Sequence, residues 1–111
     1  MDPTTHEFLV GPTWKKKRQL ILRRDGYICQ WSKRYGRTVA GSIVHHIFPR
    51  EEFPQYALCN WNLITVCADG HAALENNGAL TDDGIRLLIK TARKNNIPIP
   101  ERYASGMTPA R

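Results

Sequence analysis

The chain has 111 residues, of which 41% are hydrophobic, and its 16 lysines and arginines against 10 acids give a net charge of +6. This composition predicts one globular domain and excludes a chain that is disordered throughout. It contains no apolar run of the about 18 residues that a membrane span needs, and its N-terminal residues lack the apolar segment of a secretory signal. We therefore expect a cytoplasmic protein that is not secreted, with three cysteines as thiols or metal ligands rather than disulfides.

The first half of the chain predicts an arm, a helix and two short strands. Residues 1–12 are expected to form a flexible, irregular arm that ends at Gly11 and Pro12. Residues 14–24 predict a helix whose apolar side chains, Trp14, Ile21 and Leu22, fall near one face among basic residues. Two β-branched runs, at 38–40 and 42–47, predict short strands.

The second half predicts a strand followed by two helices. Residues 62–67 form a second long β-branched run, and residues 68–76 favour a helix that Asn77 and Gly78 terminate. Thr81 is placed to cap a last helix over about 82–95, with acids at its start and basic residues at its end. Residues 101–111 are expected to be a loose tail, so the domain spans about 13–100.

Basic residues are concentrated on one stretch of the chain. Between positions 14 and 37 there are nine of them and one acid, Asp25, which is an excess of +8. A solvated helix face is the ordinary explanation, but an excess of one sign this dense favours a polyanionic partner, DNA or RNA. Arg50 is a further candidate for a phosphate contact, with a surface ion pair to Glu51 or Glu52 as the alternative. The candidate nucleic-acid-binding residues are Lys15, Lys16, Lys17, Arg18, Arg23, Arg24, Lys33, Arg34, Arg37 and Arg50.

Four polar residues follow one another on the predicted strand–loop–strand–helix frame. His45 and His46 are adjacent at the end of the run 42–47, Asn62 follows a loop, and His71 opens the next helix. Each alone has an ordinary structural explanation, such as a hydrogen-bonded strand-end histidine or a turn asparagine. Their ordered combination is what indicates a site, because imidazole can bind a divalent metal or accept a proton from water near neutral pH.

The segments 24–30 (RDGYICQ), 44–50 (VHHIFPR) and 62–67 (NLITVC), with His71, resemble the HNH endonucleases of the ββα-metal fold. The resemblance covers about residues 14–77. It implies an α+β fold with a core at 38–77, a basic N-terminal helix and an added C-terminal helix. It also implies a divalent-metal-dependent DNA endonuclease, using Mg²⁺ or Mn²⁺, or else Ni²⁺, Co²⁺ or Zn²⁺.

By position in the motif, the resemblance makes His46 the general base and His45 and His71 metal ligands. Asn62 would hold the loop between the strands and help to orient His46. Glu75 lies four residues after His71 on the predicted helix, so it is a third candidate ligand, with a solvated helix glutamate as the alternative.

The sequence departs from the family at the structural zinc that many members bind with two Cys-x-x-Cys pairs. Cys29 is followed three residues later by Ser32, and Cys67 by Gly70, so each pair lacks its second cysteine. Two thiolates do not make the closed four-ligand site that structural zinc prefers. We expect no structural zinc, with Cys29 and Cys67 facing each other as small buried groups.

Small relatives of this kind are often phage-encoded and act with the terminase in DNA packaging, which is an expectation from the resemblance. Two other functions are weighed against a nuclease of this kind. One is a DNA-binding accessory module with weak or no cleavage, and the other is a toxin-like nuclease. The oligomeric state and the number of strands cut are not predicted.

Overall fold

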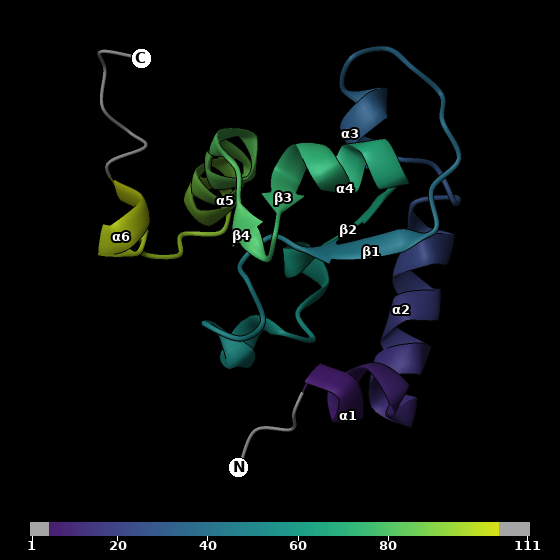
Figure 1. Cartoon of the computed structure of the whole chain (residues 1–111), viewed down its shortest axis with the longest axis horizontal. Coiled ribbons are helices and arrows are strands. Elements are labelled where there is room, and N and C mark those ends of the chain that lie inside the picture. Colours follow the sequence, from purple (N-terminus) through teal and green to yellow (C-terminus); the bar gives the residue numbers. More distant parts are fainter. Residues whose placement is uncertain (1–4, 105–111) are drawn as a thin grey trace.

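The computed structural model describes residues 5–104, in which short strands are interleaved with helices. None of the helices in this part of the chain combines the length and hydropathy of a membrane span. The elements, drawn in Figure 1, are α1 (Thr5–Val10), α2 (Pro12–Arg24), α3 (Gln30–Lys33), β1 (Ile43–His46), the short 3-10 helices η1 (Pro54–Tyr56) and η2 (Asn60–Asn62), β2 (Leu63–Val66), α4 (Ala68–Leu74), β3 (Glu75–Asn76), β4 (Ala79–Leu80), α5 (Asp82–Lys94) and α6 (Glu101–Ala104).

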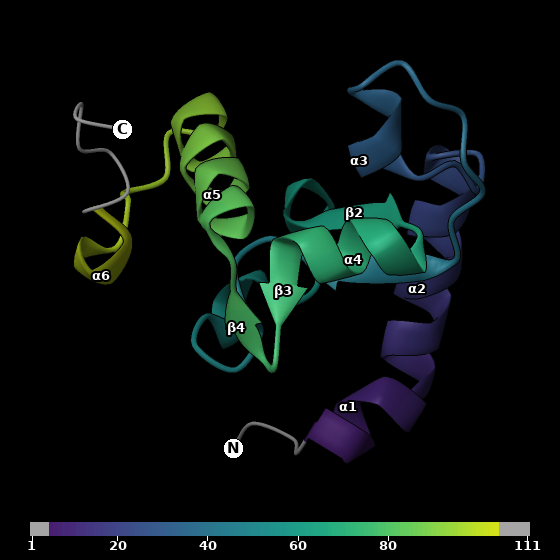
Figure 2. The same cartoon turned by 45° about the horizontal axis from the view of Figure 1, so that its top comes forward.

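The centre of the fold is the antiparallel pair β1–β2 followed by α4. His45 lies opposite Ile64 and His46 opposite Leu63, so both predicted strands, 42–47 and 62–67, are confirmed. The helix α4 lies over the strand pair (Figure 2), and α2 also packs against both strands. Because neighbouring residues of a strand point to opposite faces, His45 and His46 face different helices.

The expected strand at 38–40 is wrong. This segment makes one isolated antiparallel bridge, between Ile28 and Ala40. The backbone of Cys29 donates to the carbonyl of Val39 at 2.7 Å, and that of Gly41 donates to the carbonyl of Tyr27 at 2.8 Å. These bonds close the loop that contains α3. The chain then enters β1, so the segment 38–40 forms no longer strand pairing.

The expected irregular arm is also wrong for residues 5–10, which form α1. A helix this short is not stable alone, so it needs tertiary contacts. The ring of Phe8 supplies one, at 5.1 Å from the ring of Trp14 on α2. The start of the predicted arm, residues 1–4, lies outside the described residues. The helix α2 begins at Pro12, and its Trp14, Ile21 and Leu22 are buried as predicted.

The helix predicted over 68–76 ends earlier, at Leu74. Glu75 and Asn76 form β3, which pairs with β4 through Asn77 and Gly78, whose φ angles are 52° and 80°. Two consecutive residues with positive φ are the signature of a type I′ hairpin turn, for which Asn-Gly is the preferred pair. Asn77 and Gly78 therefore do not end the helix, as was predicted, but form the turn of a hairpin that was not predicted.

The helix α5 closes the core on the other side. Thr81 caps it as predicted, because its hydroxyl accepts a hydrogen bond from the backbone of Gly84 at 3.1 Å. Leu88 and Ala92 are fully buried in one cluster with Phe48 and other residues of the central fold.

The expected loose tail is wrong at its first four residues. Residues Glu101–Ala104 form α6, in which Tyr103 is buried and donates to Glu52 Oε1 at 2.9 Å. Residues 105–111 of the predicted tail lie outside the described part of the chain.

Candidate metal centre and active site

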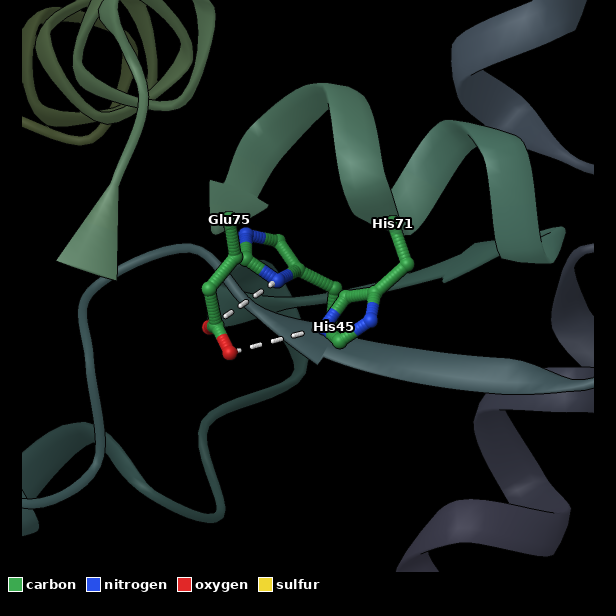
Figure 3. A group of neighbouring side chains, drawn as sticks. All are labelled: His45, His71 and Glu75. Atoms are coloured by element: carbon green, nitrogen blue, oxygen red, sulfur yellow. Dashed lines mark ion pairs between the residues drawn. The ribbon is translucent and has the colours of Figure 1, made fainter. Parts of the chain in front are cut away.

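Three potential metal ligands converge at the end of β1 (Figure 3). His45 comes from β1, His71 from α4, and Glu75 from the first position of β3. Glu75 Oε1 lies 4.0 Å from His45 Nδ1, and Glu75 Oε2 lies 3.8 Å from His71 Nε2. The rings of His45 and His71 are 5.5 Å apart, edge to face. One ligand atom of each residue lies within 4.8 Å of those of the other two.

His45 is held as a neutral ring with unused nitrogens. It is 2% exposed, and neither its Nδ1 nor its Nε2 has a hydrogen-bond partner among the described residues. Burial, together with the nearby His71 and His46, lowers its pKa to about 3. A buried ring nitrogen without a partner costs free energy, so a native structure needs a compensating interaction there.

A divalent metal ion fits this requirement. Metal–ligand bonds of about 2.0–2.2 Å place neighbouring ligand atoms about 3–4 Å apart, which is close to the separations here. Two imidazoles and one carboxylate form a donor set that suits Mn²⁺, Zn²⁺, Ni²⁺ or Co²⁺ and is compatible with Mg²⁺. His45, His71 and Glu75 can therefore hold one divalent ion. Among the described residues, no other cluster of three such ligands forms.

His46 lies on the other face of β1 and has a different environment. Its Nε2 is 3.1 Å from the backbone carbonyl oxygen of Ala57, and its ring stacks on Trp14 with centroids 5.0 Å apart. A carbonyl only accepts hydrogen bonds, so Nε2 of the neutral ring carries the proton and Nδ1 keeps its lone pair. Burial lowers the pKa of His46; the Ala57 carbonyl opposes this shift and Arg50 adds to it. A neutral ring with a lone pair at Nδ1 can accept a proton near neutral pH.

Asn62 is fully buried and connects the two ends of the loop between β1 and β2. Its Oδ1 accepts from the backbone of Phe48 at 2.6 Å, and its Nδ2 donates to the carbonyl oxygens of Phe48 and Tyr56, each at 3.1 Å. Ala57, the partner of His46, directly follows Tyr56. The loop-bracing contacts expected of Asn62 are present, and they lead through the loop to His46.

The predicted basic residues divide into two groups. Arg24 donates to the carbonyl oxygens of Asn60 at 2.8 Å and Leu63 at 2.7 Å, and Arg18 donates to that of Ser42 at 2.6 Å. These guanidinium groups hold α2 against the strands, which is a structural use that the charge count did not indicate. Arg24 is nevertheless exposed, and the other candidates that are exposed at the surface are Lys15, Lys16, Arg23, Lys33, Arg34 and Arg37.

Lys17, Arg50 and the exposed Arg34 have specific neighbours. Lys17 donates to Asn60 Oδ1 at 2.6 Å. Arg50 lies over the ring of Phe8, 4.6 Å from its centroid, and Arg34 lies over that of Trp31 at 4.8 Å. Arg50 is therefore placed on the same side of the molecule as His46, through the contact of both with Phe8.

Cys29 and Cys67 act as helix caps. Cys29 Sγ accepts from the backbone of Ser32 at 3.4 Å, and Cys67 Sγ accepts from the backbone of Gly70 at 3.3 Å. The Ser32 hydroxyl lies between them, 3.3 Å from Cys29 Sγ and 3.9 Å from Cys67 Sγ. Cys29 is fully buried and Cys67 half-buried. Burial raises the pKa of the Cys29 thiol, but hydrogen bonds from Ser32 and Cys67 outweigh it and lower the pKa to about 7.

Sequence reasoning missed the surroundings of His46. Trp14 was assigned to a helix core, and Phe8 to a flexible arm, yet both rings contact the His46 ring. No spacing in the sequence signals these contacts, because they join a terminal helix to a strand far along the chain.

The solved structure of the HNH endonuclease of the deep-sea thermophilic bacteriophage GVE2, with manganese ion, is similar to this chain. The TM-score is 0.59 at 23% sequence identity, and the match covers 82% of each chain. No protein-family model and no curated protein matches the sequence. The chain has the fold of an HNH endonuclease, as its motifs predicted.

Proposed function

We propose that this protein is a divalent-metal-dependent endonuclease that hydrolyses phosphodiester bonds of DNA. The observation that carries the proposal is the cluster of His45, His71 and Glu75, with His46 as the adjacent residue of β1, in a chain with the HNH fold. Fold alone does not establish function, so the proposal depends on this arrangement of side chains.

In this proposal His45, His71 and Glu75 hold the ion, as Mg²⁺ or Mn²⁺. When bound, a divalent cation stabilises the charge on the phosphate and on its leaving oxygen. The unpartnered nitrogens of His45 support this assignment, as does the position of Glu75 between the two imidazoles. The manganese of the similar phage enzyme supports the choice of ion.

His46 is the proposed general base. Its Nε2 proton is engaged with the Ala57 carbonyl, so Nδ1 accepts the proton of the attacking water. Asn62 keeps the loop closed and thereby keeps the Ala57 carbonyl in position. Since burial lowers the pKa of His46, the ring is in its basic form at neutral pH.

The exposed basic residues of α2 and of the segment 33–37 are proposed to contact the DNA backbone. They give the molecule an excess of positive charge, which would make affinity fall steeply with salt as counterions are released. The phage source of the similar structure supports a phage-encoded enzyme. Action with a terminase remains a prediction.

The test is cleavage of supercoiled plasmid by the wild type, His46→Ala and the control Lys90→Ala, an exposed position on α5. Each is assayed with Mg²⁺, Mn²⁺, Ni²⁺ or EDTA. We expect metal-dependent nicking or linearisation by the wild type and by the control, and a rate about 10²–10⁴-fold lower for His46→Ala.

Three outcomes would contradict the proposal. Cleavage by His46→Ala at the wild-type rate would show that His46 is not the general base. A wild type that shifts DNA at low salt, yet cuts with none of the metals, would make the protein a DNA-binding accessory module. Preferential degradation of RNA would instead favour a toxin-like nuclease.

A further inference from the structure

The ring of His46 is enclosed by two aromatic side chains from the N-terminal part of the chain. Trp14 stacks on it, with an interplanar angle of 25° and centroids 5.0 Å apart. Phe8 meets it edge-on at 5.9 Å and also contacts Trp14 at 5.1 Å. These contacts come from α1 and α2, outside the ββα core.

The single hydrogen bond of His46 does not by itself fix the ring. The bond from Nε2 to the Ala57 carbonyl fixes one atom, but it leaves the ring free to tilt about that contact. A flat indole against the imidazole face removes this freedom, because stacked aromatic rings prefer near-parallel, offset planes. The direction of the Nδ1 lone pair depends on the plane of the ring, so Trp14 also determines where that lone pair points.

Trp14 itself is firmly held. It is 5% exposed and belongs to one buried cluster with Ile21 and Leu63, and Leu63 is the residue directly opposite His46 in the strand pair. Phe8 packs against the same cluster. The position of the His46 ring is therefore tied to α2 through packing as well as to the loop through Ala57.

We propose that Trp14, backed by Phe8, is a positioning residue that fixes the plane of the His46 ring for proton transfer. This inference rests on the proposed function, since it assigns a role to the surroundings of its general base. It extends the active site to the helices α1 and α2, which the motif residues do not include.

The test compares Trp14→Phe, Trp14→Leu and Phe8→Leu with two controls, Leu9→Ala on α1 and Leu20→Ala on α2. Both control side chains are 47% exposed. Trp14→Leu is expected to lower kcat about 10- to 100-fold with little change in KM, because a misplaced reacting group affects the chemical step. Trp14→Phe restores an aromatic face and should recover most of the loss. Phe8→Leu gives a smaller loss in the same direction.

Two readouts separate positioning from a general loss of stability. In the His46→Ala background, Trp14→Leu should cause no further loss of rate, because its effect acts through His46. In NMR spectra of the metal-free protein, the ring protons of His46 should lose the upfield shift of the stacked indole in Trp14→Leu and keep part of it in Trp14→Phe. Phe8→Leu supplies the answer if Trp14→Leu does not fold.

The inference is overturned if the wild type cleaves DNA and the folded Trp14→Leu and Phe8→Leu variants keep its kcat. It is also overturned if Trp14→Leu lowers the rate equally in the His46→Ala background. A wild type that cleaves DNA with none of the metals tested would instead contradict the proposed function. The NMR shifts would still report whether Trp14 holds the ring.

Discussion

Asn62 and Phe48 are joined by two hydrogen bonds, from the Phe48 backbone to Asn62 Oδ1 and from Asn62 Nδ2 to the Phe48 carbonyl. The pair connects the residue that ends η2 with the exit of β1. A third bond, to Tyr56, ties the middle of the loop to the same side chain. One buried amide thus shapes the loop that supplies the partner of His46.

Replacing Asn62 with alanine should lower both stability and activity. The change leaves two backbone groups of Phe48 and the carbonyl of Tyr56 without their partner, and each buried unpaired group costs about 1–3 kcal/mol. Urea unfolding should show a loss of at least about 2 kcal/mol. The control Asn60→Ala, on the exposed end of η2, loses only a solvent-exposed bond from Lys17 and should stay within about 0.5 kcal/mol of the wild type. Equal stability of the two variants would refute the bracing role of Asn62.

The variant Glu75→Gln should bind Mn²⁺ more weakly. The amide keeps the shape of the side chain but loses the negative charge between His45 and His71. We expect affinity to fall at least about 10–100-fold, the range seen even for residues that only support metal ligands. Titration calorimetry measures it, with Asp69→Asn, an exposed acid of α4, as the matched control. Wild-type affinity in Glu75→Gln would exclude Glu75 from the site.

The stability of the metal-free protein should fall as the pH drops below about 6.5. Burial and two neighbouring histidines lower the pKa of His45 to about 3, from its ordinary 6.5. Between these values the unfolded chain binds a proton that the folded protein excludes, so acid favours unfolding. This group contributes a slope of up to about 1.4 kcal/mol per pH unit. His46, whose pKa is also lowered, acts in the same direction.

The measurement is urea unfolding in EDTA at several pH values, for the wild type and for His45→Gln. The variant should show a shallower dependence, because it lacks the titrating group. Curves of equal steepness would mean that His45 is protonated in the folded state, contrary to the pKa that burial imposes.

Gly84→Ala should destabilise the fold although alanine is the better helix former. A Cβ atom at this position would lie 2.1 Å from the carbonyl oxygen of Leu74, at the end of α4. The helices α4 and α5 must then separate, and overpacking of this kind costs about 1–3 kcal/mol. Thermal unfolding against Lys90→Ala, on the exposed side of α5, measures the loss. An unchanged melting temperature would show that the two helices can shift apart freely.

Much of the framework could be predicted because its signals are local. The β-branched runs before His46 and after Asn62 form the strand pair, and Thr81 caps the last helix. In these cases the preference of a few neighbouring residues is sufficient, because the backbone bonds and the cap lie within or next to the element itself. The HNH fold followed from the order of four polar residues along this framework.

The site depended on contacts that no local pattern encodes. Glu75 was named through helical spacing, yet it reaches His45 and His71 from a β-hairpin that the turn at Asn77 and Gly78 creates. The hydrogen bonds from Arg24 to backbone carbonyl oxygens could not be inferred from its charge. An arginine that binds the protein's own backbone and one that is available to a partner look alike in a sequence.

The sequence alone determined the strand–loop–strand–helix order and named the residues that are proposed to do the chemistry. Tertiary structure decided which of them meet: His45 with His71 and Glu75 on one face, and His46 with Ala57, Trp14 and Phe8 on the other. The physical reason is that alternation along a strand separates adjacent side chains, whereas the neighbours that each one finds depend on how distant helices pack.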